Sequence, residues 1–156
     1  AWLPTESILS DNTYFIRPDP DTTITSPGNS YHPLTVTAYN QLDNRIIQES
    51  GRGFTRNGHI KPDLAAPGYQ IPCALPQNRY GNASGSGAAA AFAGGAIAII
   101  LEWCVSRGNY TSITGNDISR LLTRGARHDP EILFPNNIWG YGELDVNRVF
   151  EQFASL

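Results

Sequence analysis

One uncharged stretch constrains the fold of this chain more than any other feature. It runs from Ala83 to Leu101, is 19 residues long, and the first acidic residue after it is Glu102. Its composition, dominated by Ala, Gly and Ile, predicts a helix from about Gly87 to Ser106 that is apolar nearly all round, with a stop signal at 107–109. A helix of this kind must be buried on all sides.

The length of this stretch argues against a membrane span. Only Gly87 to Leu101, fifteen residues, is continuously apolar or small, whereas a spanning helix needs roughly 20. We therefore expect a buried core helix and no membrane span. Gly94 and Gly95 lie inside it, and each costs roughly 1 kcal/mol relative to alanine. We expect this pair to let another backbone approach the helix closely.

Short strands and shorter helices surround the predicted core helix. Residues 1–30 are loop-like, because prolines and turn-forming residues interrupt any long element. Predicted strands lie at 34–39, 45–48 and 71–75, with a short apolar stretch at 64–68. Predicted helices lie at 116–124, capped by Thr114 or Asn116, and at 145–153. Strands first and helices later, around a buried helix, indicate an α/β fold.

Charge and motif content exclude several classes of function. The net charge is −3, Lys61 is the only lysine, and the arginines are scattered. No basic surface for nucleic acid is therefore predicted. The sequence contains neither a P-loop nor a dinucleotide-binding fingerprint, so we expect no cofactor.

The residues that most often bind metals are isolated in the sequence. His32, His59 and His128 have no His or Cys partner at ligand spacing, so we expect no metal. Cys73 and Cys104 are too few for a disulfide scaffold; two buried thiols are the simpler interpretation, and one disulfide stays open. We interpret the two carboxylates near the end of the sequence, Glu143 and Asp145, as parts of a solvated turn and a helix cap rather than as an acid/base pair.

The segment that could carry chemistry is the small-residue turn at 82–87, which leads directly into the apolar helix. A helix N-terminus offers free N–H groups and the positive end of the helix dipole. Both stabilise an oxyanion that develops beside a nucleophile, and small residues let a substrate backbone come close. The alternative is a turn that only allows the helix to pack tightly.

Three sequence blocks resemble those of a known protein family. Residues 58–68 read Gly-His-Ile-Lys-Pro-Asp-Leu-Ala-Ala-Pro-Gly, residues 84–91 read Ser-Gly-Ser-Gly followed by four alanines, and residues 140–145 read Gly-Tyr-Gly-Glu-Leu-Asp. In this order they resemble the blocks of subtilisin-like serine proteases. Details at 101–103, 107–109, 124–127 and 139–142 resemble the clostridial germination-protease (Csp-like) type.

The resemblance spans residues 22–153 and implies a specific architecture. It implies the C-terminal portion of a subtilisin-like α/β fold, with a parallel sheet flanked by helices and a buried central helix. Residues 22–156 would be the C-terminal part of the catalytic domain, and residues 1–21 the end of a preceding or inserted domain or linker. The resemblance also implies a bacterial spore or secreted location.

The departures from the family pattern concern catalysis. Aligning the blocks places Gly87 where the family has its nucleophilic serine, and Ser86 where it has threonine. None of the three histidines has the surroundings of the family's catalytic histidine. The chain is therefore interpreted as a pseudoprotease region with a binding or regulatory role. Its expected partners are the upstream half of its own protease domain and another protease or a propeptide.

Two other functions stay open at this point. The first is an active serine endopeptidase, completed by the upstream half, in which Ser86 substitutes for the missing nucleophile. The second is a stand-alone interaction module, which requires the 156 residues to fold cooperatively by themselves. We expect poor folding of the isolated chain, because without upstream strands the helix at 87–106 would lie partly uncovered.

Overall fold

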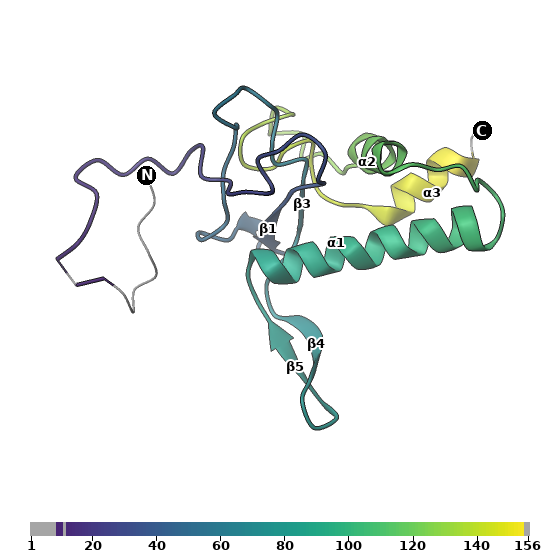
Figure 1. The fold of residues 1–156 in the computed structure, drawn as a ribbon, viewed down its shortest axis with the longest axis horizontal. Helices are drawn as coiled ribbons and strands as arrows, with labels where there is room; N and C mark the ends of the chain where they lie inside the picture. Colours follow the sequence, from purple (N-terminus) through teal and green to yellow (C-terminus); the bar gives the residue numbers. More distant parts are fainter. Residues whose placement is uncertain (1–8, 11, 155–156) are drawn as a thin grey trace.

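The computed structural model describes residues 9–10 and 12–154, and its elements follow the predicted order (Figure 1). The strands are β1 (Val36–Asn40), β2 (Arg45–Ile46), β3 (Leu64–Pro67), β4 (Ile71–Leu75) and β5 (Arg79–Ala83). The helices are α1 (Ser86–Leu101), the π-helix η2 (Glu102–Ser106), α2 (Gly115–Arg124) and α3 (Val146–Ala154). Each predicted strand and helix is present, with ends that differ by at most two residues.

Strands β1, β2 and β3 form a small mixed sheet. Its strands have the order β2-β1-β3; β1 and β3 run parallel, with Val36 opposite Leu64, and β2 runs antiparallel to β1. A single bridge extends the sheet beyond β3, where Ala65 pairs in parallel with Glu143. The parallel pair with its helices confirms the predicted α/β class.

The main core lies on the face of this sheet that carries the helices. Ala38 and Leu64 from the sheet pack in one cluster with buried residues of α1, α2 and α3, among them Ile100, Leu122 and Val149. A second, smaller cluster contains Tyr39, Ala65 and Trp139, with partly buried residues of the 132–138 segment packed against it.

Helix α1 is not buried on all sides within this chain, which corrects the first expectation. Its buried residues, spaced four, three and four positions apart, form one stripe: Ala89, Ala93, Ala96 and Ile100. Outside the stripe, Phe92 is 44% exposed and Ile99 is 53% exposed. No atom of the described residues lies within 4 Å of a Cβ built on Gly94 or Gly95. The close approach expected at this glycine pair is therefore not made by the described part of the chain.

The continuous helix Ser86–Ser106 is long and apolar enough, by length and composition alone, to cross a membrane. Among the described residues it alone meets this test. The observation is weak evidence for a span, because core helices of globular proteins meet it too. Here the buried stripe of α1 packs against β1 and β3.

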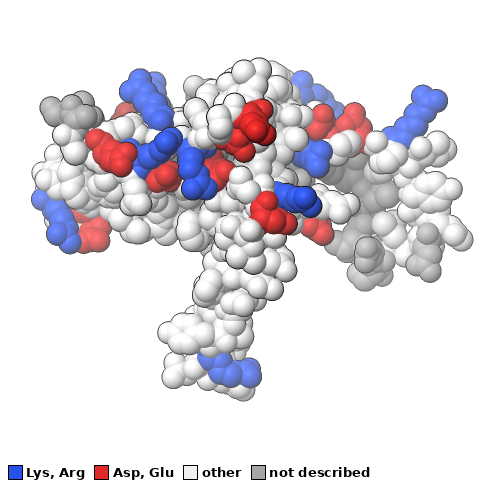
Figure 2. All heavy atoms as spheres, turned by 180° about the vertical axis from the view of Figure 1, so that it is seen from behind, with Lys and Arg blue, Asp and Glu red and all other residues white. Residues whose placement is uncertain are grey.

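Strands β4 and β5 form a hairpin that projects from the start of α1 (Figure 1). Its surface is uncharged except for Arg79, which lies near the tip (Figure 2). Strand β5 was not predicted, because its sequence, Arg-Tyr-Gly-Asn-Ala, contains Gly and Asn and no β-branched residue. Strand β5 forms because its backbone pairs with that of β4, and this pairing does not depend on a strand-forming composition of β5.

Helix α2 begins with a complete capping box. The Thr114 hydroxyl accepts a hydrogen bond from the Asp117 amide, and the Asp117 carboxylate accepts one from the Thr114 amide, at 3.3 and 3.0 Å. Thr114, rather than Asn116, is therefore the cap. The hydrogen bonds from the Thr114 side chain and backbone lower the pKa of Asp117 below its usual value.

We predict that Thr114→Ala lowers the unfolding free energy of the full-length protein by about 1 kcal/mol, because the cap is lost. The folded pKa of Asp117 is lowered, so its contribution is present above the unfolded pKa and is lost as pH falls through the folded value. The difference between wild type and variant should therefore shrink in acid. Urea unfolding at pH 7 and pH 3 measures both effects. Thr111→Ala, just before the cap, is the control; an equal loss in that variant would contradict the prediction.

Candidate functional site

The start of α1 is fixed by backbone contacts to both parallel strands. The amide of Gly85, the residue before α1, donates to the Gly68 carbonyl at 2.7 Å, and the Gly68 amide donates to the Tyr39 carbonyl at 2.8 Å. A Cβ on Gly68 would lie 2.6 Å from the Ala38 Cβ, so only glycine permits this approach. Gly85 itself has φ 111°, which favours glycine. The block at 58–68 thus positions the turn at 82–87.

The first turn of α1 presents free backbone donors. Ala89 is the first residue of the helix whose amide has a backbone acceptor, the Gly85 carbonyl at 3.1 Å. The amides of Ser86, Gly87 and Ala88 have no acceptor among the described residues. They lie at the positive end of a 16-residue helix. This is the arrangement of donors that the turn sequence predicts for an oxyanion.

A groove of about 1060 Å³ opens beside these donors. We call it the β1–α1 groove, because one wall is formed by the residues that enter β1, up to Val36, and the other by α1. It is lined by residues 20, 23–28, 33–36 and 48–52 and by six residues of α1, namely Ser86, Gly87, Ala90, Ala93, Gly94 and Ile97. The loop ahead of β1 and the segment after β2 complete its rim.

Gly87 is exposed on the wall of this groove. A Cβ built on it would have no atom within 4 Å, and its φ is not in the left-handed region. Neither packing nor backbone conformation therefore requires glycine at this position. Ser86 is also exposed and also lines the groove.

None of the three histidines lines the β1–α1 groove. His32 and His59 lie on the loops near Tyr31, with ring centroids 5.5 and 5.7 Å from it. His128 stacks on Phe134 and shares a 2.8 Å hydrogen bond with the Tyr141 carbonyl. The described residues also contain no cluster of three or more His, Cys, Asp or Glu suited to a metal ion. Cys73 and Cys104 are both free thiols, and burial raises the pKa of Cys104.

A buried ion pair that was not predicted from the sequence contacts Pro33 and Thr35, two residues that line the groove. The Lys61 ammonium donates to Asp63 Oδ2 and to the Pro33 carbonyl, both at 2.6 Å, and Oδ2 also accepts from the Thr35 amide at 2.6 Å. Lys61 is only 3% exposed. The pair thus connects the block at 58–68 to the residues that enter β1. A charged Lys-Pro-Asp sequence between apolar residues was the available signal.

A second buried carboxylate corrects an expectation. Glu143 is 4% exposed and forms an ion pair with Arg127, so it is not part of a solvated turn. The hydrogen bond with Glu143 raises the pKa of Arg127, and burial, followed by the Glu143 charge, raises the pKa of Tyr39. Asp145 does act as a cap: its carboxylate accepts from the Arg148 amide at 3.2 Å.

Comparison with known proteins identifies this arrangement. The model of the subtilase family matches residues 12–142, which is most of the chain. The chain belongs to the subtilase family. This confirms the resemblance on which the sequence analysis relied, whereas the boundary between residues 21 and 22 stays a prediction.

Solved subtilases share the fold. The CspB protease of Clostridium perfringens superposes with a TM-score of 0.87 at 32% identity, over 92% of this chain and 32% of that one. This confirms the predicted likeness to the Csp type. The patellamide maturation protease PatA superposes with a TM-score of 0.71 at 22% identity, over 87% of this chain and 48% of that one, which shows a common fold.

Among curated proteins, the C5a peptidase of Streptococcus pyogenes is 29% identical over 98 residues, or 63% of this chain. An uncharacterized protein of Aquifex aeolicus is 28% identical over 139 residues. The chain spans 8% of the C5a peptidase, 60% of the Aquifex protein and about a third of CspB. The similarity therefore concerns one part of a subtilase.

We predict that Asp63→Asn lowers the stability of this subtilase by about 3–5 kcal/mol, because it leaves the Lys61 charge buried without its counter-ion. The matched control is Glu102→Gln, which breaks the exposed pair between Glu102 and Arg107. That change should cost less than about 1 kcal/mol, because solvent screens the pair. Urea unfolding of the full-length variants measures both. Equal losses would show that burial does not set the difference.

Proposed function

We propose that this subtilase region does not hydrolyse peptide bonds and instead binds a polypeptide, as a pseudoprotease. The supporting observation is Gly87, which stands exposed in the first turn of α1 where the order of the sequence blocks predicts the nucleophile. Glycine has no side chain to attack a carbonyl. In subtilisin, loss of the triad nucleophile lowers kcat by about 10⁶; that value belongs to subtilisin and not to this chain.

Ser86 is a poor substitute for the missing nucleophile. It precedes Gly87 by one residue, and one residue of α-helix corresponds to a rotation of about 100°. Its hydroxyl therefore leaves the helix in a different direction from a side chain at 87. Nucleophilic attack requires near-contact geometry, and a misplacement of about 1 Å already costs about 10² in rate.

The binding role rests on features that remain when the nucleophile is absent. The β1–α1 groove has a volume of about 1060 Å³ and is open to solvent, and free amides point from the first turn of α1. An extended peptide suits such a groove, because its carbonyls can accept hydrogen bonds from these amides. We propose a propeptide or another protease as the bound polypeptide. The likeness to the Csp type suggests spore germination as the process that it regulates.

A further partner is proposed for the exposed side of α1. The apolar surface around Phe92 and Ile99 is exposed in this chain, and Gly94 and Gly95 line two different cavities on either side of the helix. We propose that the upstream half of the same protease domain covers this surface. Gly95, which lies on this side of the helix, would then admit the close approach expected from the sequence.

The absence of a nucleophile is tested by fluorophosphonate labelling of the full-length protein, followed by peptide mapping. We expect no label at residues 84–87 in the wild type. Gly87→Ser should fold at least as well as the wild type, with a gain of about 0.5 kcal/mol in unfolding free energy, because nothing lies within 4 Å of its Cβ. Label on wild-type Ser86 that is lost in Ser86→Ala would overturn the proposal and favour the active endopeptidase.

Covering of α1 is tested by Gly95→Ala in the full-length protein, because Gly95 lines the same cavity as Phe92 and Ile99. Where another segment packs against the glycine, the added methyl group should lower the unfolding free energy by about 1–3 kcal/mol. On an uncovered helix the same change should raise it by about 1 kcal/mol. Gly115→Ala, at the exposed start of α2, is the control and should not be destabilising. A stabilised Gly95→Ala variant would contradict the proposed partner and favour the stand-alone module.

A further inference from the structure

A second cavity, remote in sequence from Gly87, lies between α2 and two loops. It has a volume of about 410 Å³ and is lined mainly by polar side chains. His32 and His59 contribute from the loops, and Asn116, Ser119 and Arg120 contribute from α2. Nothing in the proposed pseudoprotease role uses these residues. We call it the α2 cavity.

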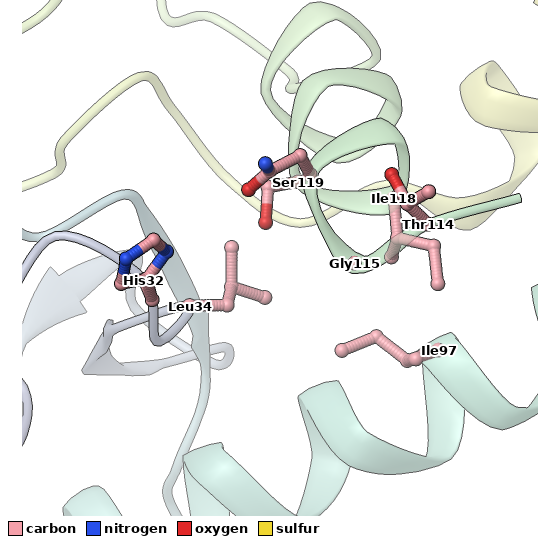
Figure 3. Close-up of a pocket in the computed structure, with 8 residues that line it drawn as sticks. His32, Leu34, Ile97, Thr114, Gly115, Ile118 and Ser119 are labelled. Atoms are coloured by element: carbon pink, nitrogen blue, oxygen red, sulfur yellow. The ribbon is translucent and has the colours of Figure 1, made fainter.

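One face of α2 is polar and borders the α2 cavity, with Asn116 and Arg120 exposed and Ser119 and Thr123 half-buried. Asn116, Ser119, Arg120 and Thr123 follow helical spacing, and all four line the α2 cavity. The apolar face, with Ile118 and Leu122, packs in the main core. Figure 3 shows the adjoining apolar hollow, where His32 from the loop and Ser119 from α2 lie on opposite walls. The two hollows share His32, Asn116 and Ser119.

The most buried residue that lines the α2 cavity is Lys61. Its side chain lines the cavity and is almost fully buried. An ammonium has three N–H donors; Asp63 and the Pro33 carbonyl accept from it. Its third donor has no acceptor among the described residues. An oxyanion in the cavity can accept this third N–H, and a hydrogen bond between two charged groups is stronger than one between neutral groups.

The charges that face the α2 cavity favour an anion. Asp63 is its single carboxylate, and the ion pair with Lys61 neutralises it. Arg120 then leaves a net positive charge, and its guanidinium suits an oxyanion because it can donate two parallel hydrogen bonds. The imidazoles of His32 and His59 lie beside Tyr31 in edge-on contacts, which orient them at the mouth.

We infer that the α2 cavity binds a small oxyanion, either a phosphate or a carboxylate. Arg120 and the free donor of Lys61 hold its oxygens, and Ser119 and the loop imidazoles supply further hydrogen bonds. The volume of about 410 Å³ is that of a small-molecule pocket. The site uses none of the residues at the start of α1, so it is independent of the pseudoprotease proposal.

The test is isothermal titration of the full-length protein with inorganic phosphate and, separately, with acetate. We expect saturable binding of at least one of the two, a melting temperature that rises with its concentration, and at least tenfold weaker binding in Arg120→Gln. Arg124→Gln is the matched control, because Arg124 lies one turn further along α2 and does not line the cavity. Its affinity should change less than twofold. His59→Gln should weaken binding at an unchanged melting temperature of the free protein.

Three results would overturn the inference. The first is the absence of saturable heat with both anions, which would mean that water alone fills the cavity. The second is an equal rise in melting temperature with sodium chloride at the same ionic strength, which would show a general salt effect. The third is equal weakening in Arg120→Gln and Arg124→Gln, which would show attraction to the charge of the helix rather than to a site.

Discussion

The junction of β1, β3 and α1 is the constraint on which the rest of the structure depends. The carbonyl of Tyr39 accepts from Gly68, and the carbonyl of Gly68 accepts from Gly85, so three backbones meet within hydrogen-bonding distance. A Cβ at position 68 would lie 2.6 Å from the Ala38 Cβ, which is too close for any residue but glycine. This junction directs the first turn of α1, with its free amides, into the β1–α1 groove.

Fold and chemistry are separable at this site. The junction and the buried pair of Lys61 and Asp63 use backbone groups and buried charges of residues that do not line the β1–α1 groove. The nucleophile position, by contrast, is one exposed residue whose side chain has no structural duty, because Gly87 has free space around it. A subtilase can therefore exchange this residue without cost to its architecture, which is the physical basis of the proposed pseudoprotease role.

The sequence predicted much of the fold from local patterns. The uncharged stretch indicated α1, β-branched residues indicated β1, and the candidate caps Thr114 and Asn116 indicated the start of α2. It did not predict β5, which contains no β-branched residue, or the burial of Glu143 in its pair with Arg127. Both depend on partners distant in sequence or on pairing across a hairpin, and local propensity contains no such information.

For the candidate site, the sequence alone determined which residues occupy the helix start: Ser86, then Gly87, with small residues on either side. Residue identity and helical period suffice for that. Only the tertiary structure decided that Gly87 is exposed in a groove, that no histidine joins it there, and that α2 meets two loops around Lys61. Cavities form between segments far apart in the chain, so their shape is set by packing and not by any one sequence block.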